Sequence, residues 1–171
     1  MNKIAILSDS HHKTDLMKDA LIHLKSMGVQ AVVHCGDFQI KENLDVLKES
    51  NLPYVSVFGN NDMPLLQYQN DFEIYKEPHY FKIGDLKCKV MHLPYYLTPD
   101  TDIVFFGHTH MFETYQKENT LFINPGEICA RNKPLSECVL LEINKDNYII
   151  KYYSKTITDI KYKEQEFIYE R

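Results

Sequence analysis

The chain has 171 residues, of which 44% are hydrophobic and 25% charged, values typical of one soluble globular domain. Its formal net charge of −5 disfavours nucleic acid as a partner, because nucleic-acid-binding proteins usually carry basic patches. No apolar run approaches the roughly 18 residues of a membrane span, and the short apolar run after Lys3 lacks a signal-peptide cleavage site, so we expect a cytoplasmic protein with no membrane partner.

The first half of the chain alternates between strand-like and helix-like segments. Apolar runs predict strands at residues 3–7, 31–34 and 53–58. Apolar residues at helical spacing predict helices at residues 14–27, where Gly28 ends the helix, and 41–50. Strands that alternate with helices predict an α/β fold with a parallel sheet.

The second half is rich in predicted strands. Residues 80–83 and 86–91 flank Gly84-Asp85 as a hairpin, and further strands are expected at 102–106, 112–116, 120–123, 138–143 and 148–153. This pattern predicts a second sheet packed on the first within one domain, residues 1–171. Residues 156–171 form a C-terminal extension with enough apolar character to cover a sheet edge or to contact a second subunit, which leaves homo-oligomerisation open.

Residue types that bind metals gather where the predicted strands end. The residues that follow apolar, strand-like runs in this way are Asp9, His11, Asp37, Asn60, His92, His108 and His110. Ligands of open α/β sheets bind beyond the carboxyl ends of the strands, so we expect these side chains to face one crevice. Gly36, Gly59 and Gly107 precede candidate ligands, where a missing side chain permits a tight turn or a close backbone approach.

The chemistry of this set favours two metal ions. Carboxylates, imidazoles and an amide suit manganese, iron, zinc or nickel better than Ca²⁺, which prefers oxygen ligands alone. The set is too large for one tetrahedral ion and suits two ions roughly 3.5–4 Å apart that share a carboxylate and hold a hydroxide. Such a pair also neutralises charge on a phosphoryl group, so the set predicts a phosphoesterase. The scattered cysteines form no CxxC pair and are expected to be reduced and structural.

At this point the chain resembles the calcineurin-like metallophosphoesterases, especially the small single-domain phosphodiesterases of bacteria and archaea. The segments that stand in the family's order are Asp9-Ser10-His11, Gly36-Asp37, Gly59-Asn60-Asn61-Asp62, His92, Gly107-His108-Thr109-His110 and Asn124-Pro125-Gly126. The resemblance covers residues 3 to about 154. It implies a four-layer αββα sandwich of two mixed β-sheets flanked by helices, with the metal site at the C-terminal ends of the strands.

The resemblance also implies which residues hold each metal. Those implied for the first metal are Asp9, His11, Asp37 and His110. Those implied for the second are Asn60, His92, His108 and the bridging Asp37. Mn²⁺ is the expected cofactor, with Ni²⁺, Zn²⁺ or Fe²⁺ as alternatives.

Asn61 and Asp62 are the expected catalytic residues. Most of the family has a histidine at the position of Asn61, oriented by an aspartate like Asp62, and this histidine protonates the leaving oxygen or holds the transition state. An amide supplies no proton, so general-acid help worth roughly 10²–10⁴-fold is expected to be missing. Asn61 can still donate a hydrogen bond to a phosphoryl oxygen. Candidate substrate contacts beside it are His12 and Arg131, and His34 either orients a ligand or is a satisfied core histidine.

Two functions from different classes follow. The leading one is hydrolysis of a phosphate ester, with diesters preferred over alkyl monoesters, by attack of a metal-bridging hydroxide. The rival is a weak or inactive member of the fold that binds proteins, like the retromer subunit that shares this architecture, and Asn61 keeps this rival open. The complete ligand set favours the enzyme, because a pure scaffold has no chemical need for it. A nuclease acting on DNA ends is disfavoured by the acidic composition.

Overall fold

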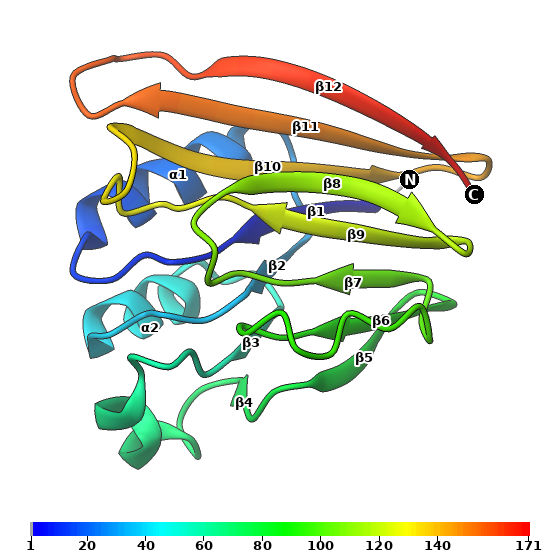
Figure 1. The fold of residues 1–171 in the computed structure, drawn as a ribbon. Coiled ribbons are helices and arrows are strands. Elements are labelled where there is room, and N and C mark those ends of the chain that lie inside the picture. The colour runs from blue at the N-terminus through cyan, green and yellow to red at the C-terminus, as the bar shows by residue number, and fades with distance from the viewer. Residues whose placement is uncertain (1) are drawn as a thin grey trace.

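Two mixed β-sheets stacked face to face form the centre of the protein over residues 2–171, which the computed structural model describes (Figure 1). The larger sheet has seven strands in the order β12-β11-β10-β1-β2-β3-β4. Its strands are β1 (Asn2–Leu7), β2 (Ala31–His34), β3 (Tyr54–Val57), β4 (Ile74–Tyr75), β10 (Leu135–Ile143), β11 (Asn147–Thr156) and β12 (Lys163–Glu170). The strands β1 to β4 are parallel, and β10, β11 and β12 add to the sheet in antiparallel fashion.

The smaller sheet has five strands in the order β5-β6-β7-β9-β8. Its strands are β5 (His79–Ile83), β6 (Leu86–Val90), β7 (Ile103–Phe105), β8 (Phe112–Lys117) and β9 (Thr120–Pro125). The pairs β6–β7 and β7–β9 are parallel, whereas the two outer pairs are antiparallel. The predicted second sheet is therefore confirmed, including its hairpin around Gly84-Asp85.

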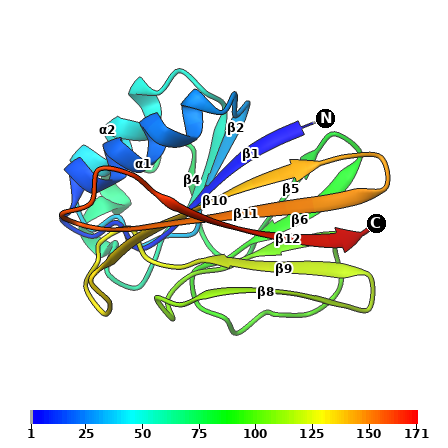
Figure 2. The same cartoon turned by 90° about the horizontal axis from the view of Figure 1, so that it is seen from above.

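The helices cover the outer face of the larger sheet (Figure 2). They are α1 (Thr14–Ser26) and α2 (Lys41–Glu49), followed by the 3₁₀ helix η1 (Met63–Tyr68). The side of α1 that faces the sheet carries Met17, Ala20, Leu21 and Leu24, all buried, at the predicted helical spacing. None of the helices among the described residues is long and apolar enough to cross a membrane.

The outer face of the smaller sheet carries no helix within residues 2–171. A small apolar cluster on this face, which includes Phe106 and Phe122, is covered by Leu97 and Tyr115. Leu97 lies in the segment between β6 and β7, where Pro94 and Pro99 oppose helix formation. The two mixed sheets and their flanking helices are thus as expected, but the expected helical layer on the second side is replaced by an irregular segment.

The C-terminal extension covers a sheet edge. Strand β12 pairs antiparallel with β11 from Lys163 opposite Ser154 to Glu170 opposite Asn147. The Phe167 ring lies 5.4 Å from that of Phe112 on the smaller sheet, so β12 also packs across the interface between the sheets. Glutamates alternate along the new outer edge, and charged side chains oppose edge-to-edge aggregation.

Candidate metal centre

The strand ends bring the predicted metal ligands to one edge of the sandwich. Strands β1, β2 and β3 run parallel in one sheet and β6 and β7 run parallel in the other, and their carboxyl ends meet. The residues gathered there are Asp9 and His11 after β1, Asp37 after β2, Asn60 after β3, His92 after β6, and His108 and His110 after β7. The side chains of Asn60 and His108 are on the exposed side, so the site opens to solvent there.

The backbone at this edge is strained. Positive φ is uncommon for residues other than glycine and marks positions that the surrounding structure holds in place. The ligands in this conformation are Asp9 (φ 53°), His11 (45°), Asp37 (60°), His108 (68°) and His110 (59°). Because such strain clusters where function requires it, these angles mark the edge as a functional site.

Glycines let the ligand-bearing turns approach one another. A Cβ atom on Gly59 would lie 2.1 Å from Asp37 Oδ1, and one on Gly107 would lie 2.2 Å from Ser8 Oγ and 3.1 Å from Asp9 Oδ2. Any larger residue at either position would push a carboxylate or its hydrogen-bonding partner aside.

Asp37 lies at the middle of the cluster. Its Oδ2 atom is 3.4 Å from His92 Nε2 and 3.7 Å from His11 Nε2. The amide of Asn61 donates to the same oxygen at 2.7 Å. Burial acts to raise the pKa of Asp37, but the hydrogen bond and charge of His92 and the Asn61 donors outweigh it and hold that pKa well below its usual range. One carboxylate oxygen therefore faces two imidazoles, as a bridging ligand requires.

Three imidazoles are oriented by a hydrogen bond at Nδ1, which leaves Nε2 directed into the site. His92 Nδ1 is 2.9 Å from the carbonyl oxygen of Cys35. His11 Nδ1 is 3.0 Å from Gln39 Oε1. His110 Nδ1 is 2.5 Å from Glu127 Oε2. Since these acceptors require a proton on Nδ1, Nε2 is in each case the nitrogen directed into the site, which is the arrangement usual for metal-binding histidines.

The amide oxygen of Asn60 lies between the other two imidazoles. Asn60 Oδ1 is 3.0 Å from His92 Nε2 and 3.0 Å from His108 Nδ1. Asn124 supports the turn that carries His108, because its Nδ2 donates to the carbonyl oxygen of Gly107 at 3.1 Å. Asn60, His92 and His108 are thus brought together, and His92 also lies close to Asp37 and Asp9.

Two buried atoms show that the site suits a cation. Asp9 Oδ1 and His11 Nε2 are buried and have no hydrogen-bond partner within residues 2–171. Asp9 Oδ1 lies 3.2 Å from His110 Nε2, yet without hydrogen-bond geometry. Burial raises the pKa of Asp9 above its usual value, which shows that a bare carboxylate there is poorly solvated. Buried polar atoms without partners are costly, and a divalent cation would satisfy both.

Asp62 acts on the backbone of the site. Its Oδ2 accepts from Asp37 N at 2.9 Å and from Gly59 N at 2.7 Å. Its Oδ1 accepts from Gln39 N at 2.6 Å. The carboxylate holds together the turns that carry Asp37 and Asn60, rather than orienting the side chain of Asn61. The structure therefore places Asp62 as a positioning residue.

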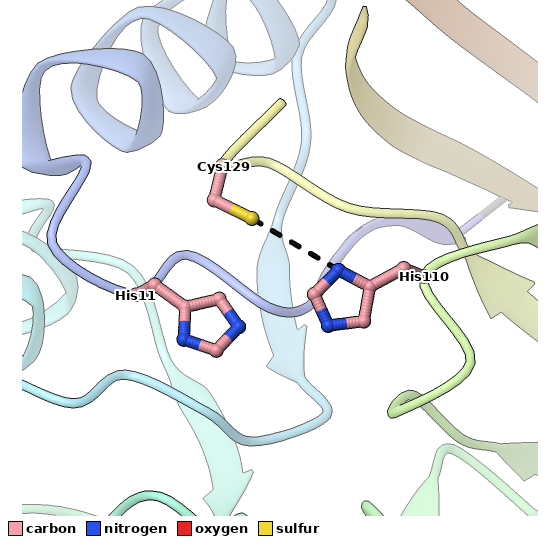
Figure 3. A group of neighbouring side chains, drawn as sticks. All are labelled: His11, His110 and Cys129. Carbon is pink, nitrogen blue, oxygen red and sulfur yellow. Dashed lines mark hydrogen bonds between the residues drawn. The ribbon is translucent and has the colours of Figure 1, made fainter. Parts of the chain in front are cut away.

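Sequence reasoning missed the residues behind His11 and His110. No sequence feature marks Gln39 as functional, and Glu127 is marked only by its place directly after the Asn124-Pro125-Gly126 motif. Cys129 was assigned a structural role, and its thiol lies near the rings of His11 and His110 (Figure 3). All four cysteines are free and buried, as expected. Burial, followed by the effect of Glu127, raises the pKa of Cys129 to about 12, so its thiol stays protonated and donates to Glu127 Oε2 at 3.3 Å.

The remaining candidate residues, His12, Arg131 and His34, differ in burial and in contacts. His12 and Arg131 are exposed, and no contact in the structure fixes either side chain on the site. His34 is buried, accepts a hydrogen bond from Gly36 N at Nδ1 (3.2 Å) and lies 3.3 Å from Ser10 Oγ at Nε2. Burial lowers the pKa of His34 to about 3, so it is a neutral core histidine that ties together two ligand-bearing turns.

Comparisons with known proteins identify the family of the chain and several similar proteins. A model of the calcineurin-like phosphoesterase superfamily domain matches residues 2–146. The phosphodiesterase MJ0936 of Methanocaldococcus jannaschii is 29% identical over 162 residues, covering 85% of this chain and 96% of that protein. The probable metallophosphoesterase YsnB of Bacillus subtilis is 26% identical over 173 residues, covering 92% of this chain and 94% of that protein. A crystal structure of a Vps29 single mutant from Entamoeba histolytica matches with a TM-score of 0.75 at 25% identity, covering 98% of this chain and 99% of that chain.

Proposed function

The chain belongs to the calcineurin-like phosphoesterase superfamily, and we propose that it is a binuclear metal-dependent phosphodiesterase of the cytoplasm. The two relatives described above carry the names phosphodiesterase and probable metallophosphoesterase, which supports a hydrolase of phosphate esters. The substrate is then a small phosphodiester or related phosphate ester.

The observation that carries this proposal is the position of Asp37 between two imidazoles, with Oδ2 3.4 Å from His92 Nε2 and 3.7 Å from His11 Nε2. A carboxylate so placed can serve two cations, with Asp9, His11 and His110 completing one position. The residues that would complete the other are Asn60, His92 and His108. Two cations held there, with Mn²⁺ expected, would supply a water-derived nucleophile at neutral pH and neutralise charge on a phosphoryl group.

The residues of the chain limit which esters react. Asn61 is half-buried beside Asp37 and carries an amide, so it can donate a hydrogen bond to a phosphoryl oxygen but cannot give up a proton. Asp62 is occupied by backbone donors and does not replace that acid. We therefore expect esters with good leaving groups to react faster than alkyl monoesters.

The test is an assay of metal-stripped protein on bis-p-nitrophenyl phosphate with Mn²⁺, Ni²⁺, Zn²⁺ or Mg²⁺ added. Metal-dependent turnover that disappears in Asp37→Ala is the expected result. Asp45→Ala is the matched control, because Asp45 on α2 pairs with Lys41 at 2.6 Å, away from the site, and should retain activity. Absence of turnover on diesters and monoesters by a protein that binds metal would refute the proposal.

That negative result would favour the second candidate, a protein-binding scaffold. The similarity to Vps29 and the amide at position 61 are the observations that support it. A scaffold predicts that Asp37→Ala leaves partner binding intact. If ester hydrolysis is the only activity that can be measured and Asp37→Ala abolishes it, the enzyme is supported instead.

A further inference from the structure

Glu127 is a fully buried carboxylate, 0% exposed, whose Oε2 atom lies 2.5 Å from His110 Nδ1. We propose that Glu127 is a positioning residue that makes the metal position of Asp9, His11 and His110 bind its cation first and more tightly than the other position. The inference rests on the proposed function only for the assignment of two metal positions.

The surroundings of Glu127 hold its carboxylate in place as an anion. Oε1 accepts from the backbone N–H groups of Asn132 and Lys133, each at 2.8 Å. Oε2 accepts from His110 Nδ1 and from the thiol of Cys129, whose place beside the His110 ring is visible in Figure 3. Because donors surround both oxygens, the carboxylate is stabilised in its ionised form, and these hydrogen bonds prevent it from rotating away from His110.

The positive charge of Lys133 is paired with a carboxylate other than that of Glu127. Lys133 Nζ lies 2.6 Å from Glu137 Oε2, so its charge is matched by a different carboxylate. Glu137 Oε2 also accepts from the backbone N–H of Glu127 at 3.0 Å, which fixes the turn from the opposite side. With Lys133 offset by Glu137, one negative charge remains behind His110.

The other oriented imidazoles have neutral partners. His92 Nδ1 faces the carbonyl oxygen of Cys35, and His11 Nδ1 faces the amide oxygen of Gln39. A carboxylate partner makes an imidazole a stronger base and fixes its tautomer more firmly than a carbonyl does, so His110 is the stronger donor to a cation.

The charges of the ligands act in the same direction. Asp9 Oδ1 lies 3.2 Å from His110 Nε2, so the position of His110 has this carboxylate beside it as well as Asp37, whereas Asn60, which faces His92 and His108, is a neutral amide. At limiting metal, the protein should therefore hold one cation at the Asp9 position before the second position fills.

The experiment is a calorimetric titration of the metal-stripped full chain with Mn²⁺. The wild type should bind in two separable steps. Glu127→Gln keeps the shape of the side chain but removes its charge, and it should weaken the tight step by roughly 10–100-fold while the weak step changes little. Glu113→Gln, at an exposed position on β8, is the matched control and should change neither step.

A second measurement keeps the inference testable if Glu127→Gln folds poorly. In ¹⁵N-labelled, metal-free wild-type protein, His110 should carry a proton on Nδ1, the nitrogen that faces Glu127. The opposite tautomer, two wild-type steps of equal affinity, or equal weakening of both steps in a folded Glu127→Gln would each overturn the proposal. Because these readouts record metal binding alone, a protein that shows them without hydrolysing esters would refute the proposed function and leave this inference standing.

Discussion

Replacing Asp62 with asparagine tests whether this residue positions the metal centre or takes part in the chemistry. The carboxylate accepts from Asp37 N at 2.9 Å, Gly59 N at 2.7 Å and Gln39 N at 2.6 Å. In Asp62→Asn, the better amide orientation keeps its oxygen on the first two donors. Its NH₂ group then faces the N–H of Gln39, so one charge-assisted hydrogen bond is lost and two donors oppose each other.

The size of the effect follows from this count. Losing a hydrogen bond to a charged group costs roughly 1.5–3 kcal/mol, so we expect the free energy of unfolding to fall by about 2–3 kcal/mol. The turn that Asp62 holds carries Asp37 at a φ of 60°, a conformation that needs external support. Loosening it displaces the Asp37 carboxylate, so metal affinity should fall together with stability if Asp37 holds metal as proposed.

Urea denaturation of the metal-free protein and titration with Mn²⁺ measure the two effects separately. The control is Asp71→Asn, at an exposed position after η1, which should change neither quantity by more than about 0.5 kcal/mol. If Asp62→Asn unfolds and binds metal like the wild type yet loses turnover, then Asp62 acts in the chemical step and the positioning role is wrong.

Three further predictions concern other parts of the molecule. Phe167→Ala should lower the free energy of unfolding by roughly 2–3 kcal/mol because it uncovers Phe112, whereas Ile168→Ala, at a side chain 59% exposed, should change little; equal effects in denaturant melts would contradict the docking of β12. Burial lowers the pKa of His92, but Asp37 and Asp9 raise it to a net value of about 9, above the ordinary 6.5. The stability that protonated His92 gives the metal-free protein is therefore complete below pH 6.5 and is lost as the pH rises through about 9. His92→Gln should flatten that decline between pH 6.5 and 9 in urea melts, and an unchanged slope would refute the assignment. Asn61→His should raise turnover of alkyl phosphate esters more than that of p-nitrophenyl esters, and an equal gain on both would show that no proton is supplied.

The placement of the candidate ligands at the ends of strands could be predicted because the sequence pattern that indicates it is local. Each ligand follows a short apolar strand, and parallel strands place their carboxyl ends at one edge whatever their exact bounds. The helices at residues 14–27 and 41–50 were predicted within a residue or so, because their apolar spacing and Gly28 are local signals too.

Features that depend on tertiary contacts could not be predicted in this way. Strand β4 has only Ile74 and Tyr75, too few residues for a periodic pattern. The sequence of residues 156–171 leaves open whether they cover a sheet edge or contact a second subunit, and only the folded protein shows β12 paired with β11 and Phe167 beside Phe112. Gln39 and Glu127 reach His11 and His110 through folded turns, and nothing in their sequence neighbourhood indicates those contacts.

The role of Asp62 shows most clearly why motif and geometry must be combined. In the motif Gly59-Asn60-Asn61-Asp62, the family resemblance implies that Asp62 orients the side chain at position 61. In the folded protein, the Asp62 carboxylate reaches back to backbone N–H groups, and the Asn61 amide reaches Asp37. Both therefore act on Asp37, Asp62 through its backbone and Asn61 through its side chain. Substitutions at either position should then affect metal binding as well as turnover, a coupling that the motif alone does not reveal.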